Sequence, residues 1–514
     1  MSDVSPMQAT DDQQPVIAFL SNPQTHGGQP VRRIDTHAAM VFLAGPRALK
    51  IKRAVRFPFL DYSTLAKRKN ACEREIEINR RFAPQIYRGC TAITRRAGGG
   101  LDIAGPGDVV EWAVDMVRFD ENLTLDRLAQ ADSIDRRLAE ELADAISQAH
   151  DQASVADESS WIESIPLLIE ANSTAFAGHF DRQRVMLLDR ASHDAFRNVR
   201  PALEQRERCG LVRHCHGDLH LANVALIDGK PMPFDAVEFD PEIATTDILY
   251  DLAFVLMDLC HFGRTEAANI VLNRYLETAA LAELEGLSAL SLFMSMRAAI
   301  RANVLLARRD TDPRAKGAAW DAAHAYFELA LHLMAPATPA LIAVGGLSGT
   351  GKSTLARQLA PLVGPAPGAL VLRSDVARKQ RFGVPATERL SSAAYRPEVT
   401  QDVYRRLMER AERILAENHA VVLDAVCSKE DERTAIAALA ARLNVPFHGL
   451  FLTADLRTRL QRVGDRAMDA SDATSQIVAQ QEGYEIGRLD WHAIDASGTP
   501  EAALAAARSV IGIE

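Results

Sequence analysis

The feature that most restricts the fold of this chain is an apolar run, residues 341–344, that stops at a glycine-rich loop. The loop fits the spacing G-x4-G-K-S, in which glycines let backbone N–H groups surround phosphates, lysine reaches the β- and γ-phosphates, and serine ligates Mg²⁺. The helix that follows adds the positive end of its dipole. We predict a nucleotide-binding P-loop; a glycine-rich turn before an ordinary helix is the alternative. The candidate residues are Gly346, Ser348, Gly349, Thr350, Gly351, Lys352, Ser353 and Thr354.

The P-loop also divides the chain of 514 residues. About a third of the chain lies downstream, which suits one α/β kinase domain, and the longer upstream part needs a core of its own. Residues 335–340 are small and punctuated by proline, as in a linker. We predict a disordered tail at 1–15, a first domain at 16–334, a linker at 335–340 and a P-loop domain at 341–514.

The composition restricts the kinds of partner and the cellular location expected for this chain. The formal net charge of -10 gives no support to a surface that binds nucleic acid. Six cysteines without a C-x-x-C pair argue against a zinc ribbon or a disulfide framework and predict reduced thiols. The first 15 residues do not resemble a signal peptide, and no run of 18 apolar residues is present. We therefore expect a cytoplasmic protein without membrane contact.

The start of the first domain predicts a β-hairpin followed by a charged helix. Two apolar runs, 39–43 and 48–52, are joined by a short turn. Lys50 and Lys52 share one face of the second strand because side chains alternate along a strand. The helix expected at 64–82 carries Glu73, Glu75 and Glu77. Beyond it the patterns predict a strand pair at 89–116, helices at 123–208, strands and loops at 211–239, and helices at 246–334.

A second chemical motif lies in the strand-and-loop block, where residues 216–223 read H-G-D-L-H-L-A-N. Asp218 and Asn223 have the spacing of a kinase catalytic loop, in which the aspartate orients or deprotonates the acceptor hydroxyl and the asparagine holds Mg²⁺. Asp235, on a strand expected at 233–239, would bridge Mg²⁺ to the phosphates; Glu238 and Asp240 are alternatives. A solvated loop carboxylate is the other interpretation of Asp218.

These residues resemble the aminoglycoside phosphotransferase family over about residues 35–330, because that family's catalytic loop reads H-G-D-L-H-x-x-N. The resemblance implies a protein-kinase-like α+β fold. It also implies Asp218 as catalytic base and Asn223 and Asp235 as metal ligands. Lys52 or Lys50 would pair with a helix glutamate, with Glu75 preferred to Glu73, and Asp251 would be a structural aspartate. A glycine-rich loop before the hairpin and an A-P-E motif are both missing, so a protein kinase is disfavoured and a non-catalytic kinase fold stays open.

The P-loop domain carries further acidic and basic candidates. A strand at 369–373 leads to Asp375, a candidate base, and Arg378 would bind an anionic group of the acceptor or the transferring phosphoryl. Helix capping is the alternative for Asp375. A second buried strand ends in Asp424, which would act on Mg²⁺ through water or on the acceptor.

A basic helix that begins near residue 456 brings Arg459 and Arg462 to one face. With the segment 469–473 it predicts a lid over the phosphates, and a solvated basic face is the alternative. A last strand at 490–495, with residues 496–500, would close the sheet and line an adenine pocket. This half resembles P-loop kinases such as gluconate kinases, adenylylsulfate kinases, polynucleotide kinases and zeta-type toxins.

Together these patterns predict a two-domain α/β chain, with a protein-kinase-like α+β domain before a parallel P-loop sheet. The function expected is a bifunctional phosphotransferase that uses ATP and Mg²⁺ to phosphorylate hydroxyl groups of small molecules. One alternative has a single active kinase with a nucleotide-sensing module. Another is a kinase for nucleic-acid ends or nucleotide-sugars.

Overall fold

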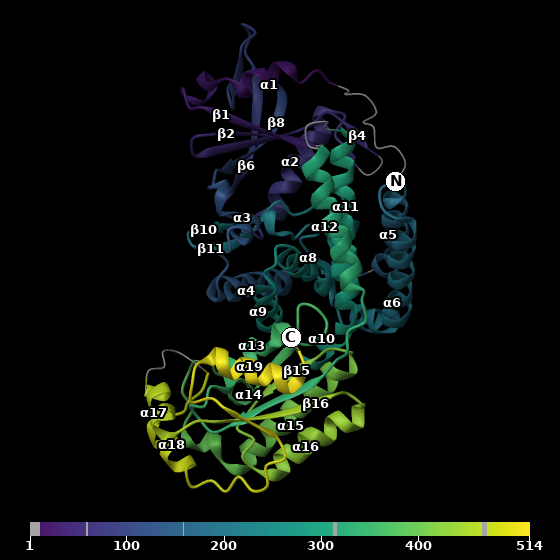
Figure 1. Ribbon diagram of the computed structural model, residues 1–514. Helices are drawn as coiled ribbons and strands as arrows, with labels where there is room; N and C mark the ends of the chain where they lie inside the picture. Colours follow the sequence, from purple (N-terminus) through teal and green to yellow (C-terminus); the bar gives the residue numbers. More distant parts are fainter. Residues whose placement is uncertain are drawn as a thin grey trace. The chain divides into compact units, whose positions relative to one another are not determined.

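The computed structural model describes residues 11–513 except 37, 58–59, 158, 312–315, 386 and 465–469. The chain divides into two compact units (Figure 1). The first contains residues up to 200 with 207–264 and 296–330, and the second contains 201–206, 265–295 and the residues from 331 onward. The predicted fold class is confirmed, because an antiparallel sheet with helices precedes a parallel α/β sheet.

The first unit begins with a six-stranded antiparallel sheet of order β1-β2-β3-β8-β6-β7. The predicted hairpin is present, with Ala39 opposite Lys52 in the register of β2 and β3. The strand pair expected at 89–116 is three strands, since the glycine turn separates β6 from a short β7 before β8. The strands are β1 (Val31–Asp35), β2 (Ala39–Ala44), β3 (Arg47–Lys52), β6 (Tyr87–Arg95), β7 (Leu101–Ile103) and β8 (Asp108–Val117).

Helix α2 (Leu65–Asn79) packs on one face of this sheet, and the hydroxyl of Thr64 caps it by accepting the N–H of Lys67. Its buried Cys72 and Ile76 join a core that includes Val114 of β8. The helix predicted at 64–82 is therefore confirmed. Its buried side carries Glu75, one of the candidate site residues.

Helix α1 (Gln14–Ser21) covers the opposite face, where Val16 and Leu20 pack against Phe42 and Ile51. The disordered tail predicted for 1–15 is wrong for residues 11–15. The side-chain amide of Gln13 donates to Lys52 O (2.8 Å) and accepts the N–H of Ala54 (2.8 Å), which holds the chain against β3. Residues 1–10 lie outside the described part of the chain.

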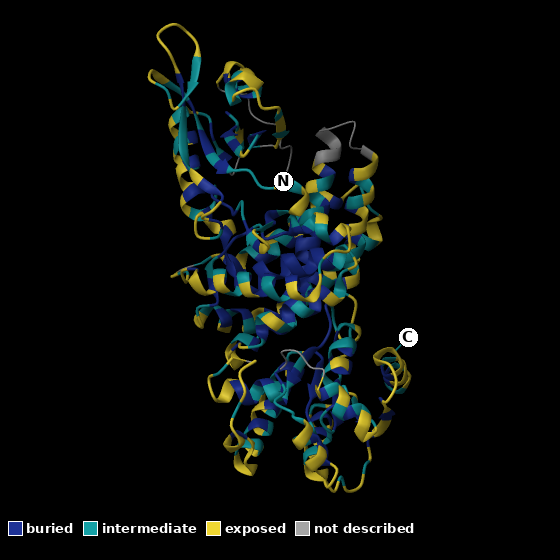
Figure 2. Cartoon of the chain, turned by 90° about the vertical axis from the view of Figure 1, so that its left-hand side faces the viewer, coloured by how far each residue is buried: buried dark blue, intermediate teal, exposed yellow. Residues whose placement is uncertain are grey.

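The rest of the first unit is mainly helical, and Figure 2 shows buried residues concentrated in its interior. Every residue of α8 (Ile248–His261) from Ile248 to Leu259 is buried. The other long helices that lie wholly or mainly in this unit are α4 (Arg136–Gln152), α5 (Trp161–Phe176), α6 (Arg182–Arg208), α11 (Leu290–Thr311) and α12 (Lys316–Leu333). The short elements around the H-G-D motif are β9 (Val212–His214), η3 (Leu221–Asn223), β10 (Val224–Ile227), β11 (Lys230–Pro233) and β12 (Thr245–Asp247).

Among the described residues, the segment Leu281–Ala307 is long and apolar enough to span a membrane by length and mean hydropathy (1.3), which the sequence had not indicated. In its most apolar window, 67% of the residues are buried inside the protein. The segment comprises α10 (Leu281–Leu284), a short turn and most of α11. Burial inside the protein accounts for its apolar character.

The second unit has a five-stranded parallel sheet of order β14-β15-β13-β16-β17, with the P-loop strand in the centre. Helices α13 and α19 lie on one face and α15 and α16 on the other (Figure 1). The strands are β13 (Leu341–Gly346), β14 (Leu370–Arg373), β15 (Val421–Asp424), β16 (Phe447–Thr453) and β17 (His492–Asp495). The helices are α13 (Lys352–Leu359), α14 (Ser374–Arg381), α15 (Pro397–Ala416), α16 (Glu430–Leu443), α17 (Leu456–Gly464), α18 (Ser475–Gln481) and α19 (Pro500–Ile511).

A segment from before the P-loop, residues 265–295, also belongs to the second unit. Its helix α9 (Thr265–Leu276) covers the edge of β14. The side chains of Asn269 and Asn273 donate to Ala369 O (3.1 Å each), and Asn273 accepts the N–H of Val371 (2.7 Å). These amides satisfy an edge that would otherwise be open to strand pairing.

Candidate active sites

The H-G-D loop of the first unit is fixed from behind by a buried aspartate on α8. Asp251 accepts the backbone N–H groups of His216 (3.2 Å) and Gly217 (3.0 Å). Gly217 has φ +81°, and a Cβ there would lie 3.2 Å from the Cα of Ala244. The motif therefore needs glycine at this place, and Asp251 has the supporting position that the resemblance implied.

Asp218 and Asn223 face each other in this loop. The amide nitrogen of Asn223 donates to the backbone oxygen of Asp218 (3.0 Å) and to its carboxylate (3.2 Å), which leaves the amide oxygen of Asn223 available to a cation. Removal from water alone would raise the pKa of Asp218. The ring of His220, 3.5 Å away, outweighs this and holds the pKa below its ordinary value, with help from His216 and Arg297. Asp218 is therefore ionised at any physiological pH.

Asp235 lies in a loop rather than in the strand predicted at 233–239, because β11 ends at Pro233. Its φ of +60° is left-handed, which turns the chain sharply after the strand. The loop is held by backbone N–H groups: that of Asp235 donates to the hydroxyl of Tyr87 (3.1 Å), and that of Ala236 to the side chain of Asn79 (2.8 Å). The Asp235 side chain is 42% exposed and accessible to a ligand.

The lysines of β3 and the glutamate of α2 form a charged cluster under the sheet. Lys50 Nζ lies 2.9 Å from Glu75 and 2.6 Å from Asp235. Lys52 lies 2.5 Å from the other oxygen of Glu75 and contacts Glu238, which is buried. Glu75 is thus the paired glutamate, and both lysines reach it. Lys50 is the one that connects it to Asp235. Glu73, outside the cluster, lies 3.5 Å from Lys69 on the helix surface, and both are largely exposed.

The donor set suits a magnesium ion. Asn223 and Asp235 offer an amide and a carboxylate oxygen, which are hard ligands. In the cluster the ammonium groups of Lys50 and Lys52 meet the carboxylates of Glu75, Glu238 and Asp235, which leaves a net negative charge. Burial disfavours the charged form of Lys50, but Asp235 and Glu75 outweigh this and raise its pKa well above the ordinary value. The alternative metal ligand Glu238 is already bound by Lys52 and by the hydroxyl of Tyr62 (3.1 Å).

In the second unit the P-loop has the backbone that its glycines predict. Gly346 has φ +135°, and a Cβ there would lie 2.5 Å from Leu452 O. Gly349 has φ +85°, and a Cβ there would lie 2.6 Å from Arg459 O. Both positions exclude any side chain, so the loop stays open to a phosphate group.

Lysine, serine and two strand ends converge beside this loop. Lys352 Nζ donates to Leu347 O (3.0 Å) across the loop. Asp424, at the end of β15, is buried and lies 3.2 Å from Nε of Arg373, at the end of β14. The same guanidinium donates to the hydroxyl of Ser353 (3.2 Å). Parallel strands bring their carboxyl ends to one edge, which is why residues far apart in sequence meet here.

Asp375 belongs to the same group. Removal from water and the nearby Asp424 carboxylate raise its pKa above 3.8, while Lys352, Arg373 and the hydroxyl of Ser471 oppose the shift. A carboxyl group with a raised pKa can accept a proton near the working pH more readily than an ordinary aspartate.

The raised pKa of Asp375 predicts a pH-dependent effect on stability. The folded protein binds this proton more tightly than the unfolded chain, so the free energy of unfolding falls as pH rises through the folded pKa. Asp375→Asn removes that loss. We expect a higher melting temperature than wild type at pH 8, with the difference shrinking towards pH 4, measured by calorimetry. The exposed Asp490→Asn is the control, and parallel profiles for wild type and Asp375→Asn would contradict the prediction.

The two predicted lid arginines both reach the P-loop, with different partners. Arg459 is buried; its Nε donates to Ser348 O (2.9 Å), and it also pairs with Glu482. Arg462 donates to Gly498 O (2.8 Å) and reaches Thr350 O (3.5 Å). Asp469 of the predicted lid lies outside the described residues.

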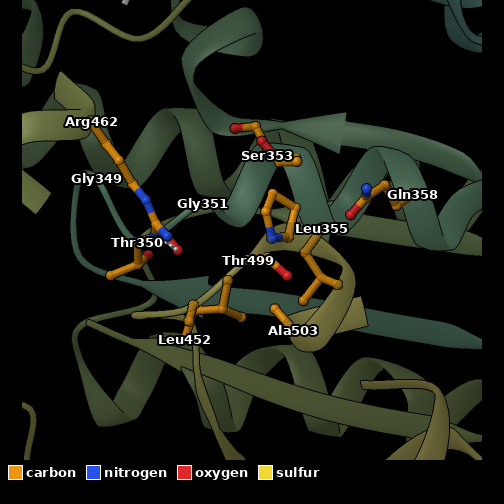
Figure 3. Close-up of a pocket in the computed structure, with 13 residues that line it drawn as sticks. Gly349, Thr350, Gly351, Ser353, Leu355, Gln358, Leu452, Arg462, Thr499 and Ala503 are labelled. Atoms are coloured by element: carbon orange, nitrogen blue, oxygen red, sulfur yellow. Dashed lines mark hydrogen bonds between the residues drawn. The ribbon is translucent and has the colours of Figure 1, made fainter. Parts of the chain in front are cut away.

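Arg462 also lines a pocket of about 280 Å³ beside the P-loop (Figure 3). Figure 3 shows its side chain reaching towards Thr350 and Gly351. Part of the pocket lining comes from residues just before α19 and at its first turn, the region expected to line an adenine pocket. The remaining lining residues include Ser353, Thr354, Leu355, Gln358, Leu452, Ala496, Thr499, Pro500 and Ala503.

Arg378 is held by its own domain. Its guanidinium is buried, donates to Ala394 O (2.6 Å) and lies 4.6 Å from the ring centre of Tyr395. The next residue, Lys379, pairs with Asp472 (2.7 Å), whose carboxylate also accepts the hydroxyl of Tyr395 (2.7 Å). These contacts attach α14 to Asp472, within the segment 469–473 of the predicted lid, and the acceptor role of Arg378 stays a prediction.

Sequence reasoning missed three residues that shape the sites. Asn79 holds the Asp235 loop, Arg373 joins Asp424 to Ser353, and Gln481 accepts the N–H of Ser348 (2.7 Å). Only Arg373 had a usable signal, since it immediately precedes the Ser-Asp pair at a strand end.

A buried group behind the first site, His150, Cys215 and Asp251, has its ligand atoms within 4.8 Å of one another. Asp251 already accepts two backbone N–H groups and lies 3.2 Å from His150 Nε2. The thiol of Cys215 faces Thr246 O (3.5 Å). This arrangement is a hydrogen-bonded support for the H-G-D loop.

Known proteins resemble this chain over part or most of its length. An AAA domain family matches residues 341–485, the P-loop and most of the sheet that follows. The chain is 30% identical over 482 residues to the uncharacterized protein Rv2004c of Mycobacterium tuberculosis, covering 91% of this chain and 92% of that one. Similar solved structures include a choline/ethanolamine kinase family protein from Mesorhizobium loti (16% identical, 63% of this chain and 98% of that chain, TM-score 0.36) and a gluconokinase from Sinorhizobium meliloti (22% identical, 34% and 97%, TM-score 0.25).

Proposed function

This chain belongs to the same family as the Mycobacterium tuberculosis protein that it matches over nine tenths of its length, and we propose that it is a bifunctional ATP-dependent phosphotransferase. Each unit would bind ATP with Mg²⁺ and transfer the γ-phosphoryl group to a hydroxyl group of a small molecule. The observation that carries this proposal is that each unit gathers cationic side chains and carboxylates around a motif typical of phosphoryl transfer.

In the first unit, Lys50 would bind the nucleotide phosphates, and Asn223 and Asp235 would hold the metal. Magnesium, when bound, neutralises charge on the β- and γ-phosphates. Asp218 would orient the acceptor hydroxyl; its low pKa makes it a weak base that remains ionised. The hydroxyl oxygen then bonds to the γ-phosphorus as the bond to ADP breaks, and its proton leaves through the carboxylate.

In the second unit the backbone N–H groups of the P-loop and Lys352 would hold the phosphates, while Ser353 would ligate the metal and Asp424 would act on it through water. The pocket beside Arg462 would take the base. Asp375 would accept the proton of the acceptor, because its pKa is raised by its surroundings. Arg459 stabilises the P-loop by donating a hydrogen bond to Ser348 O.

The partners proposed are small hydroxylated molecules, and the compartment proposed is the cytoplasm. The six cysteines all lie in the described part of the chain and form no disulfide there, which suits a reducing environment. The domain limits 16–334, 335–340 and 341–514 remain the proposed division of the sequence, with 265–295 packed in the second unit.

A screen for metal-dependent ADP release tests the proposal. Wild type, Asp218→Asn and Lys352→Ala are assayed with sugars, sugar acids, amino alcohols, nucleosides and aminoglycosides. We expect some acceptors to depend on Asp218 and others on Lys352. If all turnover depends on one of these residues and ignores the other, the bifunctional proposal is wrong.

A second function, a single active kinase with a nucleotide-sensing first unit, is favoured by one observation. β1 ends at Asp35 and β2 begins at Ala39, so the connection between these two strands is short. A connection of this length is too short to cover a triphosphate as the glycine-rich loop of a protein kinase does. Binding of fluorescent ADP to the first unit without any Asp218-dependent turnover would support this alternative.

A further inference from the structure

Arg373 connects the two groups of the second unit that the proposed function assigns to magnesium. Its Nε lies 3.2 Å from the carboxylate of Asp424, and another nitrogen of the same guanidinium donates to Ser353 Oγ at 3.2 Å. Arg373 and Asp424 are also neighbours in the register of β14 and β15. The bridge therefore follows from the sheet and does not depend on a flexible loop.

We propose that Arg373 is a built-in counter-ion that competes with Mg²⁺ for the site formed by Ser353 and Asp424. The inference rests on the proposed function, because it takes these residues as the metal-binding pair. It goes further in assigning to Arg373 control over the magnesium concentration at which nucleotide binds.

The competition follows from charge and space. Magnesium binds oxygen ligands at about 2.0–2.1 Å and admits few alternatives to octahedral geometry. The hydroxyl oxygen that would ligate the ion now accepts a guanidinium N–H, and two positive charges this close repel each other strongly away from bulk water. The contacts of Arg373 with Asp424 and Ser353 must break before the metal can enter. The free energy needed to break them lowers the affinity of the site for the metal.

The same bridge stabilises the protein. Asp424 is 4% exposed, and Arg373 is its ion-pair partner at 3.2 Å. A buried carboxylate that loses such a partner destabilises the fold. Magnesium and Arg373 are thus alternative groups that can neutralise the Asp424 carboxylate. We therefore expect bound magnesium to restore stability that is lost when Arg373 is removed.

The strand that carries Arg373 is anchored away from the site. Asn273 accepts the N–H of Val371, two residues before Arg373. A displaced guanidinium would therefore remain at this strand end, next to Asp375, because β14 itself is held in place. The metal would in this way shift a positive charge towards the proposed base.

The test measures metal-dependent binding without turnover. Binding of a fluorescent N-methylanthraniloyl-ADP to the full chain is titrated with Mg²⁺ for wild type, Arg373→Gln and Arg373→Lys. The signal lost in Lys352→Ala is taken as the P-loop site. We expect Arg373→Gln to lower the half-saturating Mg²⁺ concentration about tenfold, the scale of one charge-assisted hydrogen bond. The half-saturating Mg²⁺ concentration of Arg373→Lys should lie between those of wild type and Arg373→Gln, since an ammonium group cannot bridge both oxygens as a guanidinium does.

Thermal melting gives a second readout. In EDTA, Arg373→Gln should melt below wild type, and Mg²⁺ with ADP should recover more stability in the variant than in wild type. Arg381→Gln is the matched control, because Arg381 on α14 pairs with Asp402 (2.6 Å) away from the P-loop.

The outcomes are separable. If wild type binds the ADP probe with Mg²⁺ but Arg373→Gln leaves the midpoint unchanged or raises it, the counter-ion inference is overturned while the proposed function stands. Loss of Mg²⁺-free ADP binding in Arg373→Gln would also overturn it, since Arg373 would then be a phosphate ligand. If wild type shows no Lys352-dependent binding at all, the proposed function of this unit fails together with the inference.

Discussion

Replacing Asp218 by asparagine is expected to reduce turnover by the first unit by about 10² to 10⁴-fold, the range for loss of a positioned acid–base group. The amide keeps the shape of the side chain and its neighbours Asn223 and His220, so the loss reflects charge rather than folding. Because the pKa of Asp218 is held low, the wild-type rate that depends on it should stay constant between pH 8 and pH 6. Steady-state kinetics with the best acceptor measure both effects.

The control for this substitution is Asp228→Asn, an exposed turn residue with φ +50° that asparagine also adopts readily. It should retain full activity. Equal rates for wild type and Asp218→Asn, with nucleotide binding intact, would show that the first unit is not catalytic. That result would favour the sensing role suggested by the short connection between β1 and β2.

Replacing Lys352 by alanine is expected to lower turnover by the second unit by about 10² to 10³-fold, as for other groups that stabilise charge in a transition state. Nucleotide affinity should fall by about 10 to 100-fold, since a hydrogen bond to a charged group contributes about 1.5–3 kcal/mol. In the protein Lys352 donates to Leu347 O, so its removal leaves the buried core of α13 untouched. Isothermal titration with ADP and Mg²⁺ measures the affinity.

Lys429→Ala, at the exposed N-terminus of α16, is the matched control and should bind ADP as wild type does. Turnover that depends on Asp218 should persist in Lys352→Ala if the two sites work independently. A Lys352→Ala protein with unchanged ADP affinity and unchanged turnover would contradict the P-loop interpretation.

The P-loop and H-G-D motifs could both be predicted from the sequence because the backbone geometry of each is local. The P-loop needs left-handed glycines at fixed places, and the structure gives Gly346 and Gly349 positive φ values with no space for a Cβ. The H-G-D loop similarly needs Gly217. Hydrophobic periodicity also located the hairpin, α2 and the central strand of the parallel sheet.

Other features were predicted incorrectly because tertiary contacts outweighed local pattern. The run at 233–239 looks like a strand, but Asp235 adopts φ +60° and its loop is held by Tyr87 and Asn79, both distant in sequence. The polar segment before α1 looks disordered, but Gln13 binds the backbone of β3. The local sequence pattern does not reveal hydrogen-bond partners that lie so far away along the chain.

The sequence by itself determined which motifs are present, their order, and the backbone conformation that each requires, because spacing along the chain encodes local geometry. Only the tertiary structure decided which side chains meet across strands: Lys50 with Asp235, Arg373 with Asp424, and α9 with the edge of β14. The physical reason is that these contacts depend on the register and packing of elements tens to hundreds of residues apart, which no local pattern specifies.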